Sequence, residues 1–260
     1  MQDLRIALIQ SIQHWEDKKL NFSHFESRFL NSFQKGEADL ILLPEMFNTG
    51  FSMNAKEMAE KMDGKSIAWL IQWANQLECH IGGSLIIEEN GNYYNRFVIV
   101  SGNGVQTTYD KRHLFRMADE HQHFSSGENR VVYSLKGWRL MLQVCYDLRF
   151  PVFSRNRMVN GEKEYDVLMY IANWPKKRAF IWKNLIQARA IENQAYSIGL
   201  NRVGEDGKGI HYSGDSMVVD PWGNITEELE PHNEMVKIVT LQSKILKDIV
   251  RLFPAHLDAD

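Results

Sequence analysis

The chain has 260 residues, of which 44% are hydrophobic and 24% are charged, and its formal net charge is −3 at pH 7. This composition is typical of a folded protein with a large core, because a disordered chain is poorer in apolar residues and more strongly charged. The small negative charge gives no electrostatic reason to expect nucleic acid or an anionic membrane as a partner.

The order of the residues adds expectations about organisation and location. No linker rich in Pro, Gly or Ser divides the chain, so residues 1–260 are expected to form one domain. No apolar segment reaches membrane-spanning length, and residues 1–5 lack the basic and apolar regions of a secretory signal. Two widely separated cysteines, Cys79 and Cys145, do not make a disulfide framework. The expected setting is a reducing cytoplasm, which would keep a thiol nucleophile active.

Short apolar runs alternate with longer amphipathic stretches along the chain. The runs predict strands at residues 5–10, 40–44, 81–87, 97–101, 140–145, 167–172, 197–203, 217–220 and 236–241. Two stripes share a helical face: Phe22, Phe25, Phe29 and Phe33, and then Ile181, Leu185 and Ala188. We interpret both stripes as core packing. The alternation favours an α/β protein, although periodicity alone does not separate a doubly wound sheet from other layered folds.

Two segments in the first half of the chain suggest chemistry. Leu-Leu-Pro-Glu at 42–45 places Glu45 at the end of a wholly apolar run, where an acid is expected to be at least partly buried. Tyr-Asp-Lys-Arg-His-Leu-Phe at 109–115 places Lys111 among aromatic residues, which indicates a lysine held near a pocket. Most lysines and acids are solvated surface charges, so neither segment is decisive alone.

The third and most informative segment is Cys-Tyr-Asp-Leu-Arg-Phe-Pro at 145–151, directly after the apolar run 140–144. The cysteine follows a predicted buried strand and lies in a turn ahead of a predicted helix. Unpaired backbone N–H groups at such a turn can lower the thiol pKa and stabilise a developing anion. We therefore interpret Cys145 as an exposed thiol on a nucleophile elbow, although an isolated cysteine more often serves as a small hydrophobic side chain.

Together these segments resemble the nitrilase superfamily of carbon–nitrogen hydrolases, which share a Glu, a Lys and a Cys in that chain order. The matching residues are Glu45, Lys111 and Cys145. Agreement continues in Asn-Trp-Pro at 173–175 and in residues 214–223, so the resemblance covers nearly the whole chain. Residues 44–51 and 145–151 look most like the omega-amidase branch, and the Trp-Glu that nitrile hydrolysers carry after the nucleophile is missing. The resemblance implies a four-layer α–β–β–α sandwich with two sheets face to face.

The resemblance also implies a role for each matching residue. Cys145 would attack an amide carbonyl and form a thioester, while Glu45 would take the thiol proton and later protonate the leaving nitrogen. Lys111, helped by the backbone N–H of Tyr146, would stabilise the oxyanion. No cofactor and no metal is implied.

A second acid of the superfamily matches Glu120, which stands seven residues before Gly127. Its expected task is to orient Lys111 and the water that cleaves the thioester. Asp119 is the neighbouring alternative.

Omega-amidases cleave the terminal amide of dicarboxylic acid monoamides such as 2-oxoglutaramate and 2-oxosuccinamate, so the resemblance implies a cation for the distal carboxylate. Arg149 is the leading candidate, because a guanidinium group matches a carboxylate bidentately. The structural alternative is an ion pair of Arg149 with Asp147 or with a neighbouring acid. Arg116 and Arg178 are the reserve candidates.

Other residues are expected to form the pocket or to be uninvolved. Asn173 and Trp174 follow a buried strand and can line the pocket, and three aromatic residues, Phe47, Phe51 and Phe115, are candidates for an apolar wall. Three histidines offer an alternative base or metal site, which the absence of zinc-site spacing disfavours: His113, His121 and His123. Cys79 is expected to be packed and inert.

The sequence therefore predicts a thiol amidase that acts on small-molecule amides and, as is common in the superfamily, forms a homodimer or a larger homo-oligomer. Two alternatives stay open. An N-carbamoyl amino acid or amine hydrolase would use the same triad with more room beside the carbamoyl nitrogen. A binding module could keep the fold and lose the activity, and the intact triad is the feature that argues against it.

Overall fold

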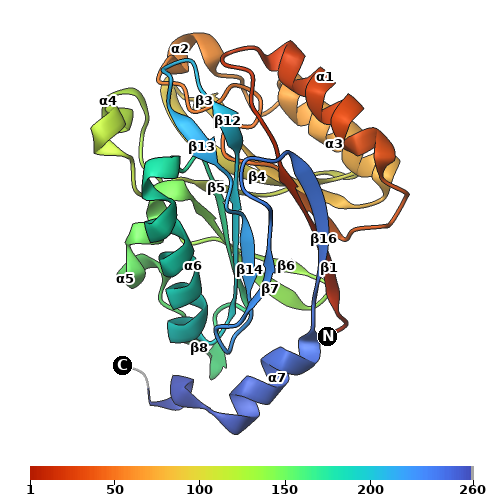
Figure 1. Ribbon diagram of the computed structural model, residues 1–260, viewed down its shortest axis with the longest axis vertical. Helices are drawn as coiled ribbons and strands as arrows, with labels where there is room; N and C mark the ends of the chain where they lie inside the picture. Colours follow the sequence, from red (N-terminus) through yellow and green to blue (C-terminus); the bar gives the residue numbers. More distant parts are fainter. Residues whose placement is uncertain (259–260) are drawn as a thin grey trace.

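The computed structural model describes residues 1–258 and places two sheets face to face, with the longer helices on the outside (Figure 1). The first sheet contains β1 (Leu4–Gln10), β2 (Leu40–Leu42), β3 (His80–Glu89), β4 (Asn92–Ser101), β5 (Gly104–Asp110) and β16 (Met235–Leu241). The second contains β6 (Val132–Leu135), β7 (Trp138–Val144), β10 (Val167–Ala172), β11 (Tyr196–Asn201), β14 (Met217–Val219) and β15 (Ile225–Glu228). Two hairpins are separate: β8 (Met158–Val159) with β9 (Glu162–Lys163), and β12 (Val203–Glu205) with β13 (His211–Ser213).

The helices connect the strands. The α-helices are α1 (Lys18–Arg28), α2 (Ala55–Met58), α3 (Lys65–Leu77), α4 (Glu120–His123), α5 (Pro151–Ser154), α6 (Ala179–Asn193) and α7 (Ser243–Leu252). Short 3-10 helices are η1 (Leu30–Ser32), η2 (Arg116–Ala118), η3 (Cys145–Arg149), η4 (Lys176–Arg178) and η5 (Ala255–Leu257). No helix in residues 1–258 combines the length and apolar character that a membrane span needs.

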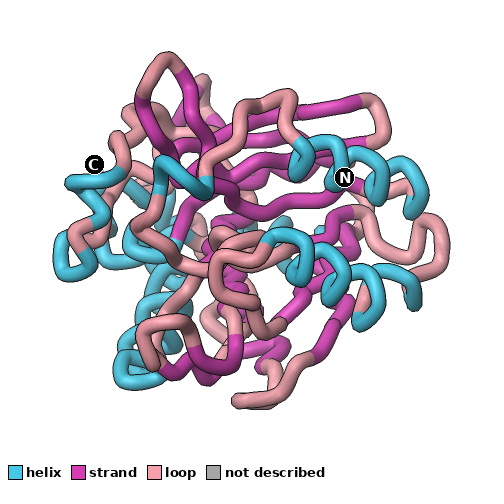
Figure 2. The backbone as a smooth tube through the Cα atoms, turned by 90° about the horizontal axis from the view of Figure 1, so that it is seen from above, coloured by secondary structure: helices cyan, strands magenta, loops and turns pink. Residues whose placement is uncertain are grey.

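The sheets have the strand orders β16-β1-β2-β3-β4-β5 and β15-β14-β11-β10-β7-β6. The neighbours β1, β2 and β3 run parallel, and so do β7, β10 and β11. Helices α1 and α3 cover the outer face of the first sheet, and α6 packs on β11 and β14 of the second (Figure 2). This is the α–β–β–α sandwich that the resemblance implies, and that prediction is confirmed.

Side chains alternate along the strands of the first sheet, so that they pack in two separate cores. In β1, Leu4, Ile6 and Leu8 enter the core between the sheets. Ala7 and Ile9 enter the core beneath α1 and α3. Successive residues of a strand point to opposite faces, so a strand that is covered on both sides reads as a continuous apolar run.

The two helical stripes differ in part from their prediction. All four phenylalanines of the first stripe pack in the outer core, but α1 ends at Arg28, and Phe33 lies beyond it in extended backbone. On α6 the fully buried positions are Trp182, Ile186 and Ala190. The predicted face of Ile181, Leu185 and Ala188 is only partly buried, because the true core face is rotated by one residue.

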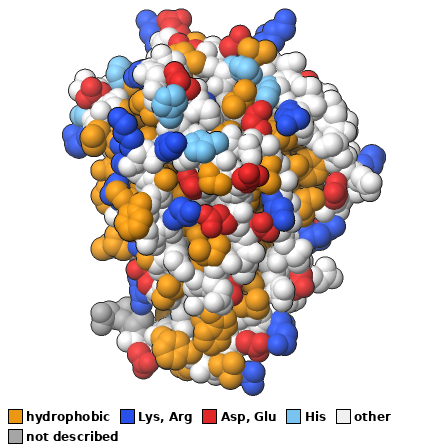
Figure 3. All heavy atoms as spheres, in the orientation of Figure 1, with side chains coloured by type: hydrophobic (Ala, Val, Ile, Leu, Met, Phe, Trp, Pro, Cys, Tyr) orange, Lys and Arg blue, Asp and Glu red, His pale blue; other side chains and the backbone are white. Residues whose placement is uncertain are grey.

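Large apolar side chains are also exposed on the outside of the second sheet and near the carboxyl end. Figure 3 shows hydrophobic side chains over α6 and at the end of the molecule near α7. The exposed members are Phe180, Ile191, Leu252, Phe253 and Leu257. The expected homo-oligomer stays a prediction, for which this surface is a candidate interface.

Candidate active site

Three of the four residues predicted for catalysis follow the carboxyl ends of strands, in both sheets. Glu45 comes after β2 and Lys111 directly after β5 in the first sheet, whereas Cys145 follows β7 in the second. The sheet-to-sheet packing brings these three residues together although 100 residues separate Glu45 from Cys145. Two of these strands, β2 and β7, have parallel neighbours, and sites at the ends of such strands are common because the strand ends fix the side chains and the loops leave room for a ligand.

Lys111 lies at the centre of this group and is fully buried. Its Nζ donates to Glu45 Oε1 at 2.9 Å and to both carboxylate oxygens of Glu120 at 3.0 Å. Burial alone lowers the pKa of Lys111, but the charges of Glu120 and Glu45 outweigh it and hold the pKa above its ordinary value. The site therefore keeps a positive charge beside the thiol at neutral pH.

Glu45 is held by its surroundings on both carboxylate oxygens. Asn95 Nδ2 donates to Oε1 at 2.7 Å, and the backbone N–H of Asn173 donates to Oε2 at 2.8 Å. The Glu45 carbonyl accepts from Asn173 Nδ2 at 2.6 Å and from Gln13 Nε2 at 2.9 Å. Asn95 and Gln13 were not among the predicted site residues. No motif marks them, because their role depends on how β4, which carries Asn95, and the loop after β1, which carries Gln13, pack against Glu45.

Glu120 and Asp119 are clearly distinguished by burial. Glu120 is fully buried at the start of α4 and accepts the backbone N–H of Phe115 at 2.6 Å, whereas Asp119 is exposed. Burial raises the pKa of Glu120, and the charge of Glu45 raises it further against the opposing effect of Lys111. The structure thus places Glu120, and not its neighbour, against Lys111.

Cys145 sits on a tight turn between β7 and η3. Its backbone φ is +47°, in the left-handed region that costs a non-glycine residue about 1–3 kcal/mol. The expectation of an exposed thiol is wrong, because Cys145 is only 8% exposed. The thiol donates to the carbonyl of Asn173, with 3.9 Å between sulfur and oxygen.

The expected lowering of the Cys145 pKa is wrong as well. Burial, followed by the negative charge of Glu45, raises the pKa of the thiol well above its ordinary value, and the Lys111 charge offsets only part of this rise. The helix after the turn, η3, is a short 3-10 segment. Its end offers less positive potential than a long α-helix would. The resting site therefore contains a thiol beside a carboxylate, an arrangement that can transfer the proton when an electrophile binds.

Asp147 holds the turn in shape from beneath. The buried carboxylate accepts from Tyr109 Oη at 2.7 Å, from the backbone N–H of Val144 at 3.0 Å and from the backbone N–H of His113 at 2.9 Å. The His113 ring lies 2.7 Å from the same carboxylate and stacks on Phe150 with 3.8 Å between ring centroids. His113 thus faces Asp147, and the predicted alternative ion pair of Asp147 with Arg149 does not form.

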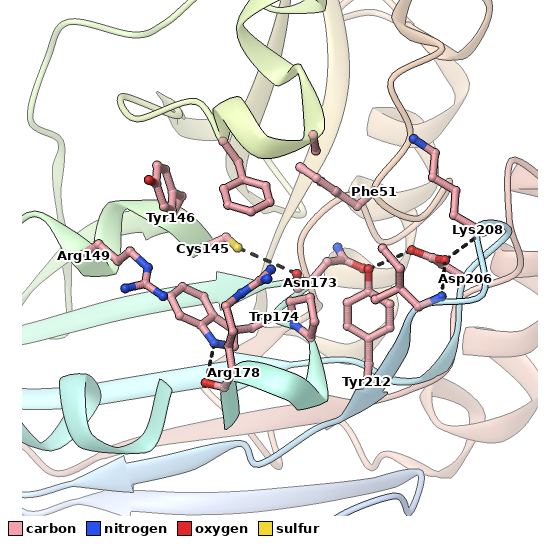
Figure 4. Close-up of a pocket in the computed structure, with 14 residues that line it drawn as sticks. Phe51, Cys145, Tyr146, Arg149, Asn173, Trp174, Arg178, Asp206, Lys208 and Tyr212 are labelled. Carbon is pink, nitrogen blue, oxygen red and sulfur yellow. Dashed lines mark hydrogen bonds between the residues drawn. The ribbon is translucent and has the colours of Figure 1, made fainter. Parts of the chain in front are cut away.

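A pocket opens in front of Cys145 (Figure 4). All six predicted substrate-binding residues line it, namely Phe51, Phe115, Tyr146, Arg149, Asn173 and Trp174. The reserve candidate Arg178 lines it too, whereas Arg116 lines a neighbouring groove. The prediction for Phe47 is wrong, because this ring is fully buried in the outer core against Phe25 and Trp69.

One wall of the pocket is not predicted from the sequence. It comes from the β12–β13 hairpin and consists of Asp206, Lys208, Ile210 and Tyr212. The Asp-Gly-Lys-Gly run at 206–209 signals a turn. Nothing in that signal says that the turn reaches the active site.

The arginines of the pocket are placed by aromatic rings. The guanidinium carbon of Arg149 lies 5.3 Å from the Trp174 ring centroid, and that of Arg178 lies 5.2 Å from the Phe115 ring centroid. Neither guanidinium forms an ion pair with any residue of 1–258. Both charges therefore stay available to an anionic ligand, held in place by cation–π contacts.

The remaining candidates are the histidines, as metal ligands, and Cys79. Within residues 1–258, no three His, Cys, Asp or Glu side chains are grouped to bind a metal ion, His121 and His123 included. Cys79 is buried in the outer core, and burial raises its pKa to about 12.

Comparisons with known proteins agree with this geometry. The family model described as carbon-nitrogen hydrolase matches residues 5–249. The chain is 44% identical to omega-amidase YafV of Yersinia enterocolitica, over 100% of this chain and 98% of the relative. It is 34% identical to 2-oxoglutaramate amidase of Bacillus subtilis, over 78% of each chain. The crystal structure of XC1258 from Xanthomonas campestris, a CN-hydrolase superfamily protein with an arsenic adduct in the active site, superposes with a TM-score of 0.96 at 41% identity, covering 100% of this chain and 98% of the other.

Proposed function

The chain belongs to the carbon–nitrogen hydrolase family and is a hydrolase that acts on amides, and we propose that its substrates are small dicarboxylic acid monoamides such as 2-oxoglutaramate and 2-oxosuccinamate. The relatives named omega-amidase and 2-oxoglutaramate amidase support this class. The observation that carries the proposal is the pocket in front of Cys145, which has arginines without acidic partners within reach of a buried thiol.

The first half of the proposed reaction forms a thioester. Cys145 Sγ attacks the amide carbon while Glu45 accepts the thiol proton, and the carbonyl oxygen becomes an oxyanion. The ammonium of Lys111 and the backbone N–H of Tyr146 stabilise that charge. When the tetrahedral intermediate collapses, Glu45 returns the proton to the nitrogen, so that the C–N bond breaks and ammonia leaves.

The second half hydrolyses the thioester. A water molecule attacks the acyl carbon and loses a proton to a carboxylate of the site; when the C–S bond breaks, that carboxyl group gives the proton to the leaving sulfur. The thiol is restored and the product is a carboxylic acid. Glu120, which is bonded to Lys111 by both oxygens, orients the ammonium during both halves and the attacking water during the second.

The distal carboxylate of the substrate is assigned to Arg149. A guanidinium fork binds a carboxylate through two parallel hydrogen bonds, and a ring such as Trp174 fixes the plane of the fork. Phe51 and Phe115 would contact the methylene carbons between the two ends of the substrate.

The test is a substrate panel with ammonia release as the readout. The purified protein is incubated with 2-oxoglutaramate, 2-oxosuccinamate, an uncharged amide of similar length, a nitrile and an N-carbamoyl amino acid. We expect kcat/KM for the two acidic monoamides to exceed that for the uncharged amide by roughly ten-fold or more, the value of one charge-assisted contact. A preference for the carbamoyl compound would favour the carbamoyl hydrolase instead, and an equal rate on charged and uncharged amides would overturn the substrate class.

A further inference from the structure

The wall of the pocket opposite Arg149 is formed by a turn that is fixed in place. The turn joins β12 to β13, and its first residue, Asp206, is buried. Asp206 Oδ1 accepts the backbone N–H groups of Lys208 at 2.8 Å and Ile210 at 3.0 Å, and Oδ2 accepts Tyr212 Oη at 2.8 Å. Gly207 packs directly against the indole ring of Trp15. A side chain would not fit at this position, because its Cβ would lie 2.5 Å from the ring. These contacts hold the tip of the hairpin over the pocket.

The ammonium of Lys208 is left without an acidic partner by this arrangement. Both carboxylate oxygens of Asp206, the nearest acid in sequence, accept hydrogen bonds from two backbone N–H groups and a hydroxyl group. Lys208 forms no ion pair with any residue in the described part of the chain. Figure 4 shows Lys208 beside Phe51, on the opposite side of Cys145 from Arg149.

The charges of the pocket differ from those of the whole chain. Its lining contains three cations, Arg149, Arg178 and Lys208, and one acid, Asp206. The chain as a whole has a formal net charge of −3. A cleft of one sign in a protein of the other sign concentrates ligands of opposite charge and raises their association rate. An enzyme for uncharged amides has no need of this arrangement.

We infer that Lys208 is a specificity-determining residue, whose charge attracts the anionic substrate into the pocket, where the distal carboxylate then binds Arg149. The inference rests on the proposed function and extends it to the hairpin. Lys208 is exposed and touches none of the reacting groups, so its effect falls on KM and on kcat/KM, while kcat stays nearly constant.

The test compares charge variants at two salt concentrations. At an ionic strength of about 0.01 M, Lys208→Glu should lower kcat/KM for 2-oxoglutaramate roughly ten-fold and for the uncharged amide less than about two-fold. Lys208→Arg should keep the wild-type value. At about 0.5 M salt the loss in Lys208→Glu should shrink, because exposed charges are screened over a few ångströms.

Lys177→Glu is the matched control. Lys177 is also exposed but does not line the pocket, and Lys177→Glu changes the net charge by the same amount as Lys208→Glu. We expect its kcat/KM to stay within about two-fold of wild type. An equal loss in both variants would show a diffuse effect of net charge and would overturn the role of Lys208.

The failure of this inference can be told from the failure of the proposed function. If wild type prefers the acidic monoamides and Lys208→Glu leaves that preference unchanged, only the inference about Lys208 is overturned. If the wild-type protein shows no such preference, the substrate class is wrong, and both the proposed function and the inference about Lys208 are overturned. Thermal unfolding of Lys208→Glu, expected at the wild-type temperature because the side chain is exposed, separates a lost charge from a damaged hairpin.

Discussion

At the scale of single residues, the group around Lys111 is an example of charges that are stable only together. One ammonium faces two buried carboxyl groups, so removal of Lys111 leaves two acids out of contact with water and without a cationic partner, whereas removal of either acid takes away one of the two partners of the ammonium. Breaking such a pair commonly costs about 3–5 kcal/mol of stability. Substitutions at these positions must therefore be judged by the amount of folded protein as well as by the rate.

The raised pKa of Cys145 predicts how the free thiol reacts with an alkylating reagent. A raised thiol pKa means that less thiolate is present at a given pH, so the rate with iodoacetamide should keep rising through pH 9, beyond the ordinary thiol pKa of about 8.5. The measurement uses Cys79→Ala protein, which has Cys145 as its one remaining thiol. Glu45→Gln removes a negative charge that raises the pKa, and should move the curve to lower pH. A plateau below pH 8 in the Cys79→Ala protein would contradict the raised pKa.

The two acids are predicted to fail at different steps. Glu45→Gln should block acylation, because no group then takes the thiol proton, whereas Glu120→Gln should slow the deacylation half more. Mass spectrometry of protein quenched under substrate should show no adduct on Glu45→Gln and an acyl adduct on Glu120→Gln. The opposite pattern of adducts would reverse the assignment of the two carboxylates.

Arg149 is predicted to select the acidic substrate. Arg149→Met removes a charge-assisted hydrogen bond worth about 1.5–3 kcal/mol, which is roughly ten- to a hundred-fold in kcat/KM for 2-oxoglutaramate and much less for the uncharged amide. Arg116→Met is the control, because Arg116 is exposed outside this pocket. Equal losses on both substrates would mean that Arg149 only shapes the elbow, and Arg178 would become the next candidate.

At the scale of elements, the elbow between β7 and η3 depends on Asp147. This carboxylate binds the strand end through Val144 and the loop after β5 through His113 and Tyr109. It therefore ties the segment that carries Cys145 to the segment that carries Lys111.

Asp147→Asn should consequently destabilise the fold and reduce activity together. An amide in place of the carboxylate leaves at least one buried donor unpaired, at a cost of about 1.5–3 kcal/mol in the free energy of unfolding. Urea unfolding measures this loss, and the exposed Asp119→Asn serves as the control with an expected change below about 0.5 kcal/mol. Wild-type stability in Asp147→Asn would show that the elbow is held by other contacts.

The central strands of the two sheets could be predicted from the sequence, but three of the four edge strands could not. The run 167–172 coincides with β10, and the other predicted runs lie within a few residues of β1, β2, β3, β4, β7, β11, β14 and β16. Within the two large sheets, the missed strands are β5, β6 and β15, and all three are at the edges. An edge strand has polar, partly exposed positions, as in Gly-Val-Gln-Thr-Thr-Tyr-Asp of β5, and lacks the continuous apolar run of a strand covered on both faces.

At the scale of the whole molecule, the layer arrangement could be predicted only from the resemblance. Periodicity gives the elements, but the packing of two sheets face to face is decided by contacts between residues far apart in the chain. The same limit applies to the site. Short motifs mark Glu45, Lys111 and Cys145, whereas Asn95 and Lys208 reach the site only because the first sheet and the hairpin fold over it.

Because the site is divided between two sheets, the side chains of the core between them set the distance between the catalytic residues. Leu8 and Leu42 of the first sheet pack in the same cluster as Leu140 and Leu142 of the second, and the volume of these side chains sets the separation of the sheets. Glu45 and Lys111 approach Cys145 only as closely as that separation allows. A core substitution far from any substrate can therefore slow the reaction in fully folded protein, because a shift of a few tenths of an ångström between the sheets misaligns the reacting groups.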